Sequence, residues 1–133
     1  MDDISVPTSP GELIDKITIL RLKADKIGDL GKLANVQREL AALAALADNL
    51  SPSDELTTLW DDLHHINATL WVIEDDIRDH DAASDFGPSF IALARAVYQT
   101  NDRRAAVKKR INLLLGSTIV EEKSYHDHGN ATQ

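Results

Sequence analysis

The chain has 133 residues, 43% of them hydrophobic and 27% charged, which is enough for one globular domain with a sizeable core. Cysteine is absent, which excludes disulfide scaffolds, zinc ribbons and thiol nucleophiles and is typical of a reducing cytosol. The formal net charge of −8 disfavours nucleic acid and anionic membranes as partners, and no stretch is apolar enough to cross a bilayer. We therefore expect a single cytoplasmic domain over residues 1–133.

A first helix is predicted from the capping box Ser9-Pro10-Gly11-Glu12, in which a serine hydroxyl and a glutamate satisfy free helical amides. Its apolar residues recur at helical spacing as far as Ile27, and residues 28–31 then form a turn. A second helix is predicted from about residue 32 to 48, with apolar residues at the same spacing. Because the connection is short, the two helices should form an antiparallel hairpin.

A third helix is predicted from Ser51-Pro52-Ser53-Asp54. Its Leu and Ile residues between Leu56 and Ile77 alternate at spacings of three and four, which is typical of knobs-into-holes packing. Pro88 opens a fourth helix that ends at Gly116. The third and fourth helices should be longer than the first two. The predicted fold is an all-α antiparallel four-helix bundle, in which a short hairpin packs on a long hairpin.

The two ends of the chain are predicted to be extended. About eight N-terminal residues and the β-branched residues 118–120 should lie against each other or along the bundle. Residues 126–133 are polar and are expected to form a frayed tail.

The fourth helix contains a polar interruption in its apolar face. Asn101, Arg104, Lys108 and Asn112 follow helical spacing, so their side chains project together. Burying such groups without partners costs several kcal/mol each. Either acids such as Glu74, Asp75 or Asp15 pair with them, or they line a pocket for an anionic or hydroxyl-rich small molecule. Asp15 and Lys16 of the first helix are candidates for the opposite wall of that pocket.

The third helix carries a second stripe beside its apolar seam, formed by Trp60, His64, Asn67 and Trp71. The tryptophans either widen the core or form half of a homodimer interface, where tryptophan is enriched. The charges are also uneven, because residues 48–85 hold eleven acids and one base, whereas residues 95–110 hold six bases and one acid. This pattern indicates either complementary neighbouring helices or a local basic site.

Asp61 and His64 have the spacing of metal ligands on one helical face, but a helical di-metal site needs two Glu-x-x-His units and further acids. The sequence therefore predicts no metal site and no cofactor.

Several blocks of the sequence resemble an uncharacterised bacterial and phage family, catalogued as a domain of unknown function. They are Ser9–Leu20, Lys32–Leu40, Val97–Ala105 and Val120–Tyr125. The resemblance implies an association with glycosyltransferase and other surface-polysaccharide genes. It also implies that one set of polar residues belongs to the family pattern: Asp15, Lys16, Asn35, Asn101, Arg104, Lys108, Asn112, Glu122 and Lys123.

We expect a homodimeric binding or assembly module that recognises an anionic ligand or a nucleotide sugar in surface glycan metabolism. The predicted ligand site comprises Asp15, Lys16, Asn101, Arg104, Lys108, Asn112, Glu122 and Lys123, and the predicted interface comprises Trp60, His64 and Trp71. One alternative is a small helical enzyme for a phosphorylated or carboxylated metabolite, with Asp15 or Glu122 transferring protons. Another is a purely structural oligomerisation bundle.

Overall fold

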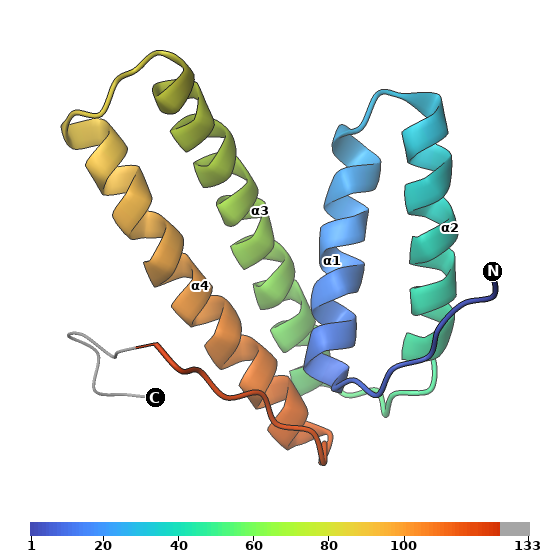
Figure 1. Cartoon of the computed structure of the whole chain (residues 1–133). Coiled ribbons are helices and arrows are strands. Elements are labelled where there is room, and N and C mark those ends of the chain that lie inside the picture. The colour runs from blue at the N-terminus through green and yellow to red at the C-terminus, as the bar shows by residue number, and fades with distance from the viewer. Residues whose placement is uncertain (126–133) are drawn as a thin grey trace.

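The computed structural model describes residues 1–125, which contain four helices and no strand. The helices are α1 (Pro10–Lys26), α2 (Leu30–Ala47), α3 (Asp54–Ala82) and α4 (Pro88–Leu114). α1 and α2 form a short hairpin, α3 and α4 form a long one, and the two hairpins diverge toward the α3–α4 turn (Figure 1). The predicted all-α four-helix bundle is confirmed, and the predicted tail, residues 126–133, lies outside the described residues.

Short polar side chains set the starts of the first three helices. Ser9, Asp29 and Ser53 each accept a hydrogen bond from the backbone amide three residues further on, as N-cap residues do. Because Asp29 caps α2, that helix begins two residues earlier than predicted, and the turn before it is shorter. α4 ends as predicted, since Gly116 adopts a positive φ of 66° directly after the last turn.

α1 is the central helix of the fold. It contacts α2, α3 and α4, whereas α2 contacts only α1 among the described helices. Ile14, Ile17 and Leu20 of α1 are buried, and Ile14 joins a core cluster with Leu63 of α3, Ile111 of α4 and their neighbours. α2 has no fully buried residue, although its apolar stripe is as regular as that of α1. The short hairpin therefore packs on the long hairpin through α1.

The segment after α4 returns along the bundle. Residues 117–125 are irregular and run beside α4 (Figure 1), held by contacts of Glu121 with Lys108 and of Lys123 with Asp102. The two ends of the chain meet where the Ser9 hydroxyl donates to Glu121. None of the helices within residues 1–125 combines the length and the apolarity needed to cross a membrane.

The N-terminus of α1 approaches the backbone of α4 very closely. The Gly11 amide donates to the Asn112 side chain at 2.7 Å. A Cβ atom at position 11 would lie 2.6 Å from the Lys108 carbonyl oxygen and 2.8 Å from Asn112 Oδ1. The carbonyl belongs to a helix backbone and cannot move aside, so only glycine allows this approach.

We predict that Gly11→Ala lowers the free energy of unfolding by about 1–3 kcal/mol, although alanine usually stabilises a helix relative to glycine. Gly28→Ala is the matched control, because no atom lies within 4 Å of its added Cβ. It should be neutral, or stabilising by up to about 1 kcal/mol. Urea unfolding of both variants measures the difference, and equal effects would contradict the close approach.

Candidate functional site

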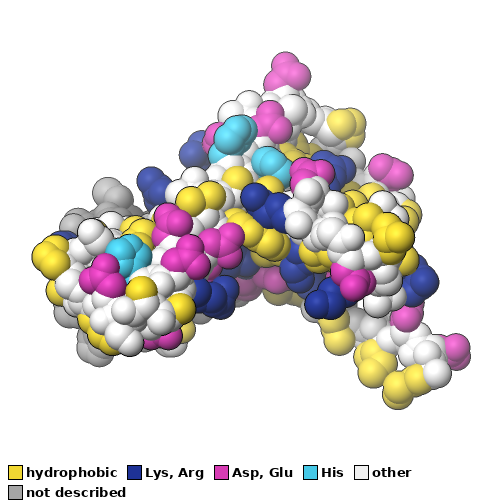
Figure 2. Space-filling model, turned by 90° about the horizontal axis from the view of Figure 1, so that it is seen from above, with side chains coloured by type: hydrophobic (Ala, Val, Ile, Leu, Met, Phe, Trp, Pro, Cys, Tyr) yellow, Lys and Arg dark blue, Asp and Glu magenta, His cyan; other side chains and the backbone are white. Residues whose placement is uncertain are grey.

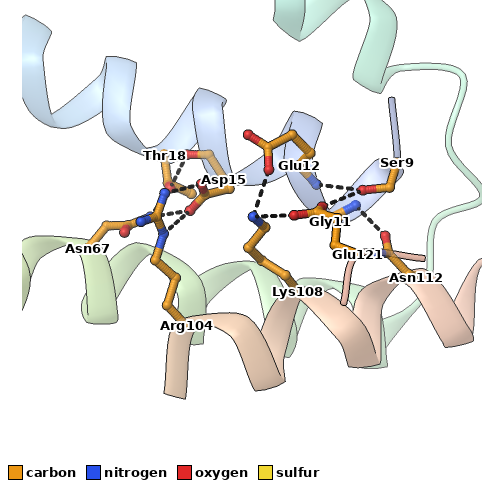
Figure 3. A network of polar contacts seen from close by, with 10 residues as sticks. All are labelled: Ser9, Gly11, Glu12, Asp15, Thr18, Asn67, Arg104, Lys108, Asn112 and Glu121. Carbon is orange, nitrogen blue, oxygen red and sulfur yellow. Dashed lines mark hydrogen bonds and ion pairs between the residues drawn. The ribbon is translucent and has the colours of Figure 1, made fainter. Parts of the chain in front are cut away.

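Asp15 lies at the centre of a buried polar network and is only 1% exposed. Arg104 of α4 binds both carboxylate oxygens, with Nε donating to Oδ1 at 2.9 Å and Nη2 donating to Oδ2. Asn67 of α3 donates its Nδ2 to Asp15 Oδ1 at 2.9 Å and to the Thr18 hydroxyl at 2.8 Å. One carboxylate of α1 is thus bound by side chains of both α3 and α4 (Figure 3).

A second network lies one turn nearer the α1 N-terminus (Figure 3). Lys108 Nζ donates to Glu12 Oε2 at 2.6 Å and to Glu121 Oε2 at 3.2 Å. The other oxygen of Glu121 accepts from the Ser9 hydroxyl at 3.1 Å. This lysine therefore joins α4 to the start of α1 and to the C-terminal segment.

The two cations of these networks are held in their charged forms. The hydrogen bond to Asp15 raises the pKa of Arg104, and its effect exceeds the opposing effect of burial. Burial alone would lower the pKa of Lys108. The hydrogen bond and charge of Glu12, together with the hydrogen bond of Glu121, outweigh burial and raise that pKa above its usual 10.5.

An open groove of about 370 Å³ lies beside the Asp15 network, between α1 and the long hairpin. Ile19 and Leu22 of α1 and Leu70 and Trp71 of α3 supply its apolar lining. Asn67, Asn101 and Arg104 supply polar lining next to the network, and Glu74, Asp75 and Arg78 supply charged lining from α3. Seen from above, hydrophobic, basic and acidic side chains surround the hollow between the two hairpins (Figure 2).

Three polar groups of the groove have hydrogen-bonding capacity that residues 1–125 do not use. Arg104 binds Asp15 through Nε and Nη2, which leaves Nη1 without a partner there. Asn67 is 4% exposed and uses only its Nδ2, while its Oδ1 turns away from Asp15 (Figure 3). The Asn101 carboxamide makes no hydrogen bond within these residues. Since every fully buried side-chain nitrogen or oxygen in this part of the chain has a partner, these three groups are accessible to solvent, and their residues line the open groove.

The structure divides the predicted ligand site into two parts. Asn101 and Arg104 line the groove, with Asp15 buried behind Arg104. Lys108 and Asn112 instead bind the start of α1, outside the groove. Lys16 and Glu122 are exposed and make no hydrogen bond within residues 1–125, whereas Lys123 pairs with Asp102.

The predicted ion-pair network on α4 is also present, with Asp15 as its buried acid. The other acids considered do not take part, because Glu74 pairs with Arg78 at 3.4 Å and Asp75 has no ion pair in the described part of the chain. Arg104 is therefore both a structural partner of Asp15 and a wall of the groove.

The predicted interface residues lie on the face of α3 that is near α1. Arg21 lies 5.6 Å from the centre of the Trp60 ring, and Lys26 lies 5.7 Å from that of Trp71. Trp60 also packs against the core cluster, and His64 is half-buried. Trp60 thus widens the core toward α1, whereas Trp71 lines the groove, and an interface through these residues stays a prediction.

Residues 1–125 contain no group of three or more His, Cys, Asp or Glu side chains that could hold a metal ion. Asp61 is instead in contact with His65, whose ring nitrogen lies 2.8 Å from the Asp61 backbone oxygen within α3.

Sequence reasoning missed several members of the networks. Asn67 appeared only as part of the tryptophan stripe, and Glu12 and Ser9 only as a helix cap, because their tertiary partners are far away in the sequence. Asn67 did give a signal, since an asparagine beside an apolar seam needs a partner when it is buried.

A family model described as a family of unknown function (DUF6165) matches residues 4–132. Neither the curated proteins nor the solved structures include a match to the chain.

Because the pKa of Lys108 is raised, its contribution to stability is complete below pH 10.5 and is lost as the pH rises through the higher folded-state value. We predict that Lys108→Met costs about 2 kcal/mol of unfolding free energy at neutral pH. The difference from wild type should stay constant through pH 9 and shrink only above about pH 10.5. Urea unfolding across this pH range measures it, and a difference that falls between pH 6 and 9 would contradict the assignment.

Proposed function

The chain belongs to this family of unknown function, and we propose that its groove binds the sugar ring of a hydroxyl-rich ligand. The observation that carries the proposal is the Asn67 side chain, which is almost fully buried and still has an unpartnered oxygen beside the groove. Because this oxygen is open to the groove, a ligand hydroxyl can donate to it in place of water.

The hydrogen-bonding groups beside the groove match hydroxyl groups. Asn67 Oδ1 accepts, Arg104 Nη1 donates, and the Asn101 carboxamide does both. A hydroxyl group also donates and accepts, so neighbouring hydroxyls of one sugar can satisfy all three. Trp71 and Leu70 offer apolar surface for the carbon face of the ring.

The charges of the groove favour a neutral ring over an anion. Arg104 is neutralised by Asp15, and Arg78 by Glu74, while Asp75 adds a negative charge. A phosphate or carboxylate would therefore meet no free cation from the groove lining. The volume of about 370 Å³ lies at the small end of the range for ligand sites, which suits a single ring. A nucleotide sugar would be recognised through its sugar.

The enzyme alternative is less well supported. It assigned proton transfer to Asp15 or Glu122. Asp15 is buried and occupied by Arg104 and Asn67, and Glu122 is an exposed residue that does not line the groove. A general acid or base must reach the reacting group, so neither residue suits that role. We therefore favour a binding module, in keeping with the glycan context that the family resemblance implies.

We predict that glucose, N-acetylglucosamine or UDP-glucose shifts the NMR signals of the Trp71 indole and of the Asn67 and Asn101 carboxamides, while UDP alone does not. Asn101→Leu should weaken binding by about tenfold or more, because a hydrogen bond to the ligand is lost. Its melting temperature should stay within about 2 °C of wild type, since no hydrogen bond of the described chain is lost.

The matched control is Asn35→Leu on α2, outside the groove, which should bind as wild type does. Binding of UDP as tight as that of UDP-glucose would show an anion site, and no shift with any of the sugars would refute the proposal.

A further inference from the structure

Each helix of the long hairpin carries a regular row of exposed residues. On α3 the acidic row is Asp61, His65, Thr69, Val72, Asp76 and Asp79. On α4 the basic row is Arg95, Gln99, Arg103, Ala106, Arg110 and Leu113. Both rows follow the same spacing of four, four, three, four and three residues, so each forms one continuous stripe along its helix.

Neither row takes part in the packing of the chain. α1 is bound through Asn67 of α3 and through Arg104, Lys108 and Asn112 of α4, which occupy other faces of these helices. The acidic row lacks the Leu and Ile residues of the α3–α4 seam. Helical geometry therefore places both rows on the side of the hairpin away from α1.

The charges of the rows have no partners within the described chain. None of their aspartates or arginines forms an ion pair in residues 1–125. Each row also contains one large exposed apolar residue: Val72 is 54% exposed and Leu113 is 68% exposed. A helical stripe with this spacing and with apolar members commonly packs on another helix.

The register of the hairpin sets acids level with bases. Asn67 and Arg104 bind the same carboxylate, so they lie at the same height on antiparallel helices. Nine residues from each toward the hairpin turn, Asp76 is level with Arg95. Six residues from each in the other direction, Asp61 is level with Arg110.

We propose that this face binds a second copy of the chain, with a two-fold axis parallel to the helices. In this arrangement α3 of each subunit packs on α4 of the other subunit. The two long hairpins together then form an up-down-up-down four-helix bundle. Asp76 faces Arg95 of the partner subunit, and Asp61 faces Arg110 of the partner subunit. A two-fold axis across the helices would instead set α3 on α3 and acid on acid, so the charges select the first arrangement.

This interface lies opposite the groove and opposite Trp60 and Trp71. The interface is independent of the proposed sugar site, and the grooves of both subunits stay open to solvent. Because the pairs are formed by exposed side chains, the dimer should weaken as ionic strength rises.

The test uses two charge-reversed variants, Asp61→Lys/Asp76→Lys and Arg95→Glu/Arg110→Glu, with analytical ultracentrifugation at low salt. Wild type should sediment at about twice its chain mass of 14.6 kDa. Each variant alone should be monomeric, with its dissociation constant raised by about 100-fold or more, because like charges then face each other. An equimolar mixture of the two should form a heterodimer, since the acidic and basic rows again match.

The control is Lys32→Glu/Arg38→Glu on α2, which makes the same charge change as Arg95→Glu/Arg110→Glu but away from this face, and it should stay dimeric. Far-UV circular dichroism confirms that each variant is folded. A monomeric wild type, dimeric reversed variants, or a mixture that stays monomeric would each overturn the proposal.

Discussion

The Asp15 carboxylate is bound at the same time by Arg104 of α4 and Asn67 of α3, and the arrangement of the helices depends on this contact. A buried carboxylate is unfavourable unless it is paired and hydrogen-bonded, so α1 can dock only where both partners reach it. Apolar packing of α1 on the long hairpin would by itself tolerate shifts along the helix axes. The Asp15 contact fixes the height of α1, and the close approach of Gly11 to α4 fixes its tilt at the lower end.

The groove is a consequence of the same contact. α1 is held tightly at its N-terminal end, and the two hairpins diverge above it, which leaves an opening beside the network (Figure 1). Arg104 and Asn67 satisfy Asp15 with some of their polar atoms and line the groove with the others. A structural role and the proposed binding role are therefore compatible for these residues. A ligand at this position would contact the residues that hold α1, so binding should also stabilise the fold.

The helices and the polar face of α4 could be predicted from the sequence because their signals are local. Caps and apolar spacing locate the helices to within about two residues, and Arg104 was expected to meet an acid such as Asp15. The role of Gly11 and the peripheral place of α2 could not be predicted, since both depend on which helices meet. The stripe of α2 is as apolar as that of α1, yet only α1 contacts the long hairpin. Arg104 and Lys108 lie on one face of α4, but they are one helical turn apart. Arg104 therefore lines the groove, whereas Lys108 binds the start of α1.

The most direct test of the account is a double-mutant cycle on Asp15→Ala and Arg104→Ala, measured by urea unfolding at pH 7. Arg104→Ala should lose about 3 kcal/mol or more, because it leaves the buried Asp15 carboxylate without its partner, and Asp15→Ala should lose about 2 kcal/mol or more, because the remaining Arg104 is half-buried. The double variant should lose at least about 2 kcal/mol less than the sum of the two. If the two losses instead add to within about 0.5 kcal/mol, the pair is not coupled, and Asp15 does not hold α1 to the long hairpin.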